Sequence, residues 1–170
     1  SVSKETVLNY IEAIKAMYLF DELSAWNKSD YDKLGKRSKY MATDSSMVAN
    51  VLGWNEENVY LDEQKNGKLI ETWVYNQLSS IADLSHEYTI SHYRDNKKRE
   101  IDFIVERQDG AILGIEVKSG AASNSDFKHL KWFASNLAKN NFIGIVFYSG
   151  KHTLRFGERF YAVPLSALGA

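Results

Sequence analysis

The chain of 170 residues is 44% hydrophobic and 25% charged, and it has no cysteine. This length predicts one compact domain with at most a small appendage. The absence of cysteine excludes disulfides, thiolate metal sites and a cysteine nucleophile. Lys and Arg total 21 against 22 for Asp and Glu, so the net charge gives no overall attraction to nucleic acid, although it leaves room for a local phosphate site.

Membrane and export signals are missing from the sequence. No apolar run approaches the roughly 20 residues that a membrane-spanning helix needs. The first five residues, Ser-Val-Ser-Lys-Glu, contain no apolar signal region. We therefore expect a cytoplasmic protein with no membrane partner.

The N-terminal part of the chain predicts a helix followed by a polar segment. Ser3 can cap an amphipathic helix whose apolar character continues toward Leu23. Such a helix needs a partner surface for its apolar face. Residues 26–40 are polar and basic and predict an exposed loop or hairpin.

Two further helices are expected before the first long strand. Asp44 can cap a short helix that Gly53 ends. An acidic connector over 56–63 leads to the most regular helical pattern, which runs from about residue 69 to residue 84. Glu71 lies beside the apolar face of that helix, near its start.

The remainder of the chain predicts strands and one crossover helix. The predicted strands are residues 86–93, 99–107, 111–119, 142–148, 153–156 and 160–163. A helix over 123–139 connects the third strand to the fourth, so we expect those two strands to be parallel. The fold class is therefore α/β, a mixed sheet with helices on its faces.

Three charged residues lie inside apolar strands, where an unpaired charge is costly. They are Asp102, Glu116 and Lys118. Glu116 and Lys118 are two residues apart and share one face of their strand. A three-residue loop or a bulge near Gly110 would bring Asp102 opposite Glu116, whereas a two-residue turn would not.

With that register, Asp102 and Glu116 could share a divalent cation, either Mg²⁺ or Mn²⁺, with water as the remaining ligands. The metal would polarise a phosphoryl oxygen and lower the pKa of a bound water. Lys118 could orient that water or stabilise charge on phosphorus. Glu71 could add a third carboxylate. The simpler alternative is a structural ion network of the same four residues.

These residues resemble the PD-(D/E)XK signature of restriction-endonuclease-like nucleases. Asp102 is followed after thirteen residues by Glu116-Val117-Lys118, in a strand–turn–strand–helix context. Glu71 resembles the extra glutamate of the Holliday-junction-resolvase-like branch. Ile101 stands where the signature has proline. The resemblance implies a restriction-endonuclease-like fold with catalytic Lys118 and with Glu71, Asp102 and Glu116 as metal ligands.

A closer resemblance covers almost the whole chain. It is to the uncharacterised C-terminal domain that follows the ATPase module in bacterial and archaeal AAA-type ATPases. The segments that carry it are Thr6–Ile11, Lys39–Asp44, Glu71–Leu78, Tyr93-Arg94, Glu100–Glu106 and Ile115–Lys118. The resemblance implies a fragment of a longer protein, with an ATPase module in cis. It also implies that residues 1–22 are a remnant of a preceding winged-helix segment and that residues 23–170 form the nuclease-like domain.

Three functions remain open from the sequence. The first is Mg²⁺-dependent hydrolysis of nucleic acid, with DNA favoured over RNA. The second is a catalytically silent binding or regulatory module that uses the nuclease fold as a platform, which the balanced charge supports. The third is a toxin-like or antitoxin-like partner domain with its N-terminal helix in an interface. No Walker A motif is present, so we expect no ATP hydrolysis by this chain.

Overall fold

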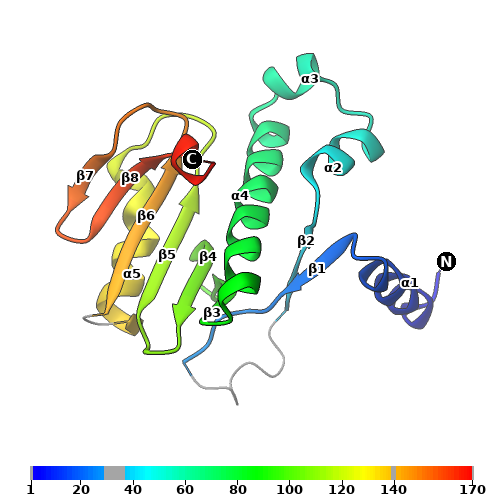
Figure 1. Cartoon of the computed structure of the whole chain (residues 1–170), viewed down its shortest axis with the longest axis horizontal. Helices are drawn as coiled ribbons and strands as arrows, with labels where there is room; N and C mark the ends of the chain where they lie inside the picture. The colour runs from blue at the N-terminus through cyan, green and yellow to red at the C-terminus, as the bar shows by residue number, and fades with distance from the viewer. Residues whose placement is uncertain (1, 29–36, 139–140, 170) are drawn as a thin grey trace.

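The computed structural model of the protein describes residues 2–28, 37–138 and 141–169 (Figure 1). Its helices are α1 (Lys4–Ala16), α2 (Ser45–Val51), α3 (Glu56–Tyr60), α4 (Glu63–Ser85) and α5 (Lys128–Phe133), with 3-10 turns η2 (Asn124–Phe127) and η4 (Leu165–Leu168) and a π-helical turn η3 (Ala134–Ala138). Its strands are β1 (Phe20–Leu23), β2 (Lys39–Ala42), β3 (Tyr88–Arg94), β4 (Glu100–Arg107), β5 (Ile112–Val117), β6 (Phe142–Tyr148), β7 (Leu154–Gly157) and β8 (Phe160–Pro164).

Strands β3 to β8 form one mixed sheet in the order β3-β4-β5-β6-β8-β7. Strands β3, β4 and β5 are antiparallel neighbours, whereas β5, β6 and β8 run parallel to one another. The predicted mixed sheet and its parallel β5–β6 pair are therefore confirmed. The crossover helix predicted over 123–139 is instead divided into η2, α5 and η3, and residue 139 lies outside the described residues.

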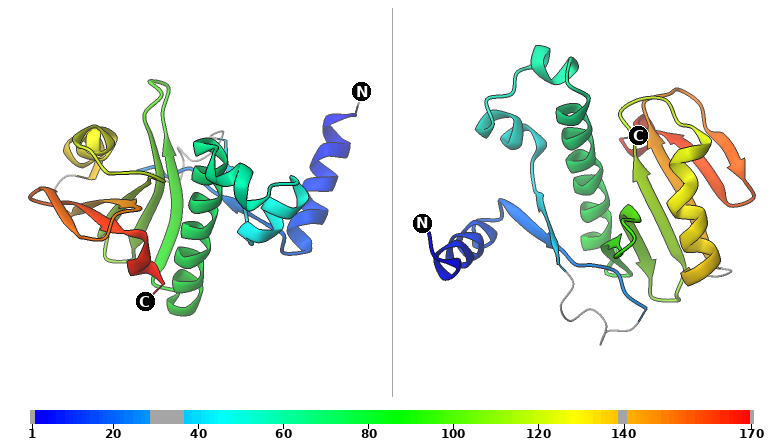
Figure 2. Two further views of the ribbon diagram at one scale, coloured as in Figure 1. Left: turned by 90° about the horizontal axis from the view of Figure 1, so that it is seen from above. Right: turned by 180° about the vertical axis from the view of Figure 1, so that it is seen from behind.

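A helix covers each face of this sheet, α4 on one side and α5 on the other (Figure 2). Val74 of α4 packs in one core cluster with Phe103 of β4 and Ile115 of β5. Leu130 and Phe133 of α5 belong to the second cluster. All five side chains are fully buried, and each such burial contributes roughly 1.5–3 kcal/mol. The two helices thus hold β4 and β5 from both sides.

Helix α4 begins earlier than its apolar pattern predicts. The side chain of Asp62 accepts two backbone hydrogen bonds of the first turn, so the helix begins at Glu63 rather than near residue 69. The acidic connector contains an unexpected short helix, α3, capped by Asn55. Ile81, predicted on the core face of α4, is 52% exposed. Among the described residues, no helix is both long and apolar enough to cross a membrane.

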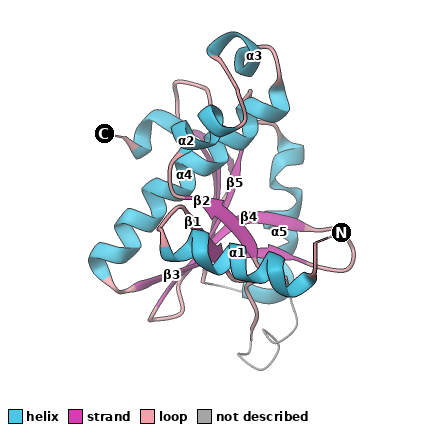
Figure 3. Cartoon of the chain, turned by 90° about the vertical axis from the view of Figure 1, so that its right-hand side faces the viewer, coloured by secondary structure: helices cyan, strands magenta, loops and turns pink. Residues whose placement is uncertain are grey.

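The N-terminal arm consists of α1 and the two-stranded β1–β2 ribbon, which Figure 3 views from its own side of the molecule. No residue of α1 is buried, and the helix ends at Ala16 rather than continuing toward Leu23. The chain reverses at Tyr18, whose φ of +57° costs a non-glycine residue about 1–2 kcal/mol, and then enters β1. The boundary expected between residues 22 and 23 falls inside this strand.

The chain after β1 joins the arm to the edge of the large sheet. Ala25 forms a parallel bridge with His92 of β3, and the backbone nitrogen of Trp26 donates to the His92 carbonyl at 2.6 Å. The Trp26 ring lies 4.8 Å from that of Phe133. Most of the loop or hairpin expected over 26–40 lies outside the described residues. As predicted, Asp44 caps α2.

A candidate carboxylate metal site

The loop between β4 and β5 fixes how the two charged strands face each other. The backbone nitrogen of Arg107 donates to the Ala111 carbonyl at 2.9 Å, which closes a three-residue loop ending at Gly110. Gly110 has a φ of +81°, which glycine adopts without strain. Phe103 pairs with Ile115, so Asp102 stands opposite Glu116. The three-residue loop predicted near Gly110 is confirmed, together with the register that it implies.

A β-bulge lies at Asp102 on the other edge of β4. Ser91 of β3 pairs with Ile104, and Tyr93 pairs with Ile101. Asp102 and Phe103 therefore both stand against the one residue His92. A bulge of this kind bends its strand and redirects a side chain, and such bulges are common beside active sites. Alternation alone did not predict this irregularity.

The structure brings three of the four sequence-predicted residues into direct contact. The backbone nitrogen of Val117 donates to Asp102 Oδ2 at 2.9 Å. The carboxyl groups of Asp102 and Glu116 share a hydrogen bond. Lys118 Nζ lies 3.7 Å from Glu116 Oε2, with the lysine side chain 40% exposed and the glutamate 10% exposed. A buried glutamate and a half-buried aspartate thus adjoin a lysine that reaches solvent.

Burial and mutual repulsion keep the acid pair from ionising fully. Burial, and then the charge of Asp102, raise the pKa of Glu116 to about 9. Burial, and then the charge of Glu71, also raise the pKa of Asp102. Two carboxyl groups in contact cannot both ionise cheaply, so they hold a proton between them at neutral pH. A divalent cation could replace that proton.

The fourth predicted residue, Glu71, is near this pair but is held by two lysines. Lys39 of β2 donates to Glu71 Oε1, and Lys68 Nζ lies 3.2 Å from Glu71 Oε2. Burial alone would raise the pKa of Glu71, but the two ammonium groups outweigh it and hold that pKa below its usual value. Glu71 is therefore ionised, and its charge reaches Asp102.

Asp102, Glu71 and its two lysines line a polar hollow of about 710 Å³, whereas Glu116 and Lys118 are not part of its lining. Its lining comprises Arg37, Ser38, Lys39, Lys68, Glu71, His92, Arg94, Glu100 and Asp102. His92 is 5% exposed, and its Nδ1 has no hydrogen-bond partner within the described part of the chain. Burial lowers the pKa of His92, so the imidazole is neutral at pH 7. An orphaned ring nitrogen in a polar hollow suits a ligand or a water.

Sequence reasoning missed Lys39, Lys68 and His92 as members of this site. Lys39 lies in a segment that carries the family resemblance, but it meets Glu71 across 32 residues of sequence. Lys68 stands one helical turn before Glu71, so an i,i+3 pair was foreseeable. His92 alternates with its strand neighbours like any half-buried residue and has no spacing that marks a site.

The residues present fit a hard divalent cation held by two carboxylates. Mg²⁺ is commonly bound through one or two carboxylates with several waters retained, and Asp102 and Glu116 offer such a donor set. Across residues 2–28, 37–138 and 141–169, no group of three or more His, Cys, Asp or Glu side chains is close enough to hold a metal together. The structure therefore offers a pair of oxygen ligands, with Glu71 held aside by Lys39.

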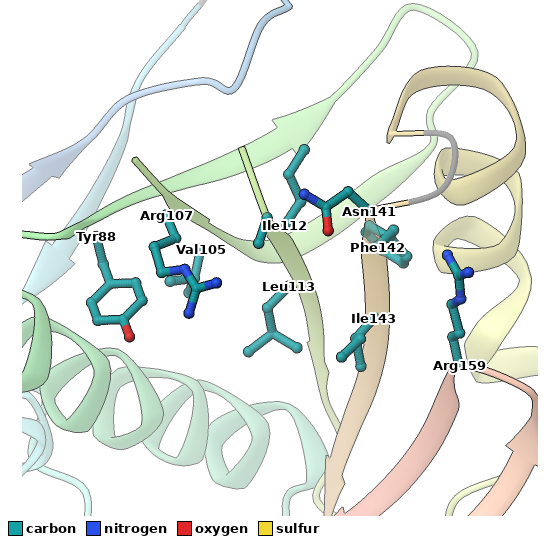
Figure 4. A pocket seen from close by; sticks show the side chains of 10 residues that line it. Tyr88, Val105, Arg107, Ile112, Leu113, Asn141, Phe142, Ile143 and Arg159 are labelled. Carbon is teal, nitrogen blue, oxygen red and sulfur yellow. The ribbon is translucent and has the colours of Figure 1, made fainter. Parts of the chain in front are cut away.

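A second hollow of about 570 Å³ lies at the other end of β4 and β5 (Figure 4). Val105, Leu113 and Ile143 form a row across its floor on three neighbouring strands. Arg107 and Arg159 stand on its two sides. None of the sequence-predicted site residues lines it, whereas Glu71 and Asp102 line the polar hollow.

Comparison with known proteins gives one family and one distant structure. The family described as "Domain of unknown function (DUF4143)" matches residues 66–168, which include all four predicted site residues. No curated protein matches the chain. A solved structure, the refined half-complex from the tetradecameric assembly of Thermococcus gammatolerans McrB AAA+ hexamers with bound McrC, contains a chain that is 9% identical. The match covers 58% of this chain and 27% of that one with a TM-score of 0.38, too low to support a shared function.

Proposed function

Since the chain belongs to the DUF4143 family, whose domain has no known function, we propose a function from its site: a divalent-metal-dependent phosphodiesterase centre acting on nucleic acid, with DNA favoured over RNA. The observation that carries this proposal is the contact of Asp102 with Glu116 on neighbouring strands, with Lys118 beside them. Adjacent acids with raised pKa values and a specific cationic neighbour are typical of functional sites.

The topology supports a restriction-endonuclease-like fold as part of this proposal. Helix α4 precedes three antiparallel strands, α5 then crosses over, and β6 runs parallel to β5. The two acids lie on the second and third of these strands and Glu71 lies on the preceding helix. This is the element order in which the sequence resemblance expects them.

Each residue has a role that its surroundings allow. Asp102 and Glu116 hold Mg²⁺ or Mn²⁺ through carboxylate oxygens, and Glu71 is a further ligand when it is released. The ion supplies polarisation of a phosphoryl oxygen and a lowered pKa for a bound water. Lys118, with its partly exposed ammonium group, orients that water or stabilises negative charge on phosphorus.

The same resemblance supports a setting for the domain. We infer that the chain works while joined to an ATPase module in cis, with residues 1–22 as a remnant of a winged-helix segment and residues 23–170 as the nuclease-like domain. Only the resemblance of the sequence supports this inference.

Cleavage of supercoiled plasmid and of branched DNA tests the proposed activity. We expect cutting with Mg²⁺ or Mn²⁺ and none with EDTA. Asp102→Asn and Lys118→Met should lower the rate by at least about 100-fold, because each removes a group that acts on the reacting phosphate. Circular dichroism spectra would show that both variants fold.

Matched controls are exposed residues of the same type. Glu158→Gln and Lys151→Met change one charge each on the outer surface and should cut like the wild type. Equal residual cleavage by the wild type, Asp102→Asn and Lys118→Met would assign the cutting to a contaminant and overturn the proposal.

A catalytically silent module is the second candidate, and the ion pairs favour it. Lys39 already neutralises Glu71, and Lys118 already lies beside Glu116, so the acids have counter-charges without a metal. In that case, Mn²⁺ would neither bind near Asp102 nor raise the melting temperature.

A further inference from the structure

The ammonium group of Lys39 lies inside the carboxylate site although it comes from the N-terminal ribbon. It donates to Glu71 Oε1 and lies 5.8 Å from the centre of the Phe103 ring. Phe103 follows Asp102 directly in β4, and the charge of Lys39 also acts on the Asp102 carboxyl. One internal ammonium therefore faces two of the three acids.

A second lysine contacts the same carboxylate from a different setting. The Lys68 side chain is 66% exposed, whereas that of Lys39 is 21% exposed. Water and salt screen an exposed ammonium, so it contributes little to a pair. A partly buried ammonium acts through a lower effective dielectric. Lys39 is thus the main counter-charge of Glu71, and Lys68 is a matched comparison.

We propose that Lys39 sets the cation occupancy of this site, because its ammonium holds the position at Glu71 that a divalent ion would otherwise share with Asp102. The inference rests on the proposed metal site and adds that metal uptake competes with an internal cation. The divalent ion enters at Asp102 and Glu116, and Glu71 joins it only when Lys39 withdraws.

The side chain of Lys39 has its own route of withdrawal, since it is 21% exposed. Strands β1 and β2 are four residues each and pair only with one another among the named strands that the structure describes. Lys39 stands at the first position of β2, opposite Leu23 at the end of β1. A change of rotamer can therefore move the ammonium away from Glu71 while the ribbon, β4 and β5 keep their pairing.

Mn²⁺ titration of the purified chain, read by electron paramagnetic resonance, tests the proposal. Lys39→Met keeps the length of the side chain and removes its charge, so the Kd for Mn²⁺ should fall at least about tenfold. Lys39→Arg keeps the charge and should bind Mn²⁺ as the wild type does. Lys68→Met should change the Kd by less than about threefold, because its charge is screened.

If Lys39→Met fails to fold because Glu71 has lost its main partner, the same substitution is tested in Glu71→Gln protein. In Glu71→Gln protein the carboxylate that accepts from Lys39 is absent, so removing the ammonium leaves no such partner unpaired. Adding Lys39→Met to that background should still tighten Mn²⁺ binding, because the ammonium no longer repels the ion at Asp102.

The outcomes separate this inference from the function on which it rests. Mn²⁺ binding that Asp102→Asn abolishes, but that Lys39→Met leaves unchanged in both backgrounds, would overturn the role of Lys39 and leave the metal site standing. Absence of Mn²⁺ binding in every variant, Lys39→Met included, would overturn the metal site itself. If Lys68→Met tightened Mn²⁺ binding as much as Lys39→Met does, the effect would come from net charge alone. That result would also overturn the inference.

Discussion

Glu116 is a buried acid whose proton should govern how stability depends on pH. Its folded-state pKa of about 9 lies above its unfolded value, so the native state binds more protons between pH 5 and 9. Stability of the metal-free protein should therefore fall as pH rises through that window. Glu116→Gln keeps the shape and the hydrogen bond to Asp102 without the charge, so it should flatten this slope and stabilise the protein by about 1–3 kcal/mol at pH 8.

Urea denaturation of both proteins in EDTA across this pH range measures the effect. Glu158→Gln, on the exposed β7–β8 turn, is the control and should follow the wild type. A wild-type stability that rises between pH 5 and 9 would show that the acid pair is ionised in the native state and would contradict the shared proton.

At the scale of elements, the β4–β5 loop determines whether the acids meet. A Cβ at Gly110 would touch nothing within 4 Å, so Gly110→Ala adds only backbone strain at φ +81°. We expect it to cost about 1–2 kcal/mol. The same substitution at Gly67, inside α4 with equally open space, should instead stabilise by about 0.5–1 kcal/mol. Urea midpoints of the two variants should therefore move in opposite directions, and a shift of the same sign would contradict the assigned loop geometry.

The elements of the sheet could be predicted because their signals are local. The glycine of the β4–β5 loop and the charged residues within apolar strands predicted the Asp102–Glu116 register from the sequence. The cation at Glu71 could not be predicted, because Lys39 reaches it through the packing of a separate ribbon. The bulge at Asp102 could not be predicted from the sequence either, because it depends on how β3 pairs with two partners, β4 and the chain at Ala25.

For the whole molecule, the two parts of the N-terminal arm differ in how they attach to the rest of the fold. Helix α1 buries no residue, and its ion pair from Lys15 to Glu22 joins partly exposed groups, which water and salt screen. The ribbon and the chain that follows it, by contrast, place Leu23, Trp26 and Met41 in the two cores. Helix α1 is therefore an appendage, whereas the ribbon is an integral part of the fold, and the division between them lies near Tyr18.

Two truncations test this division. The free energy of unfolding of a chain starting at residue 19 should lie within about 1 kcal/mol of that of the full chain, because the truncation removes no buried side chain of α1. A chain starting at residue 44 loses five buried apolar side chains (Leu23, Ala25, Trp26, Met41 and Ala42) and the Lys39 ammonium, and it should lose at least about 5 kcal/mol or fail to fold. Thermal and urea unfolding measure both. A loss above about 3 kcal/mol on removing α1 alone would make that helix integral to the fold and would overturn the division near Tyr18.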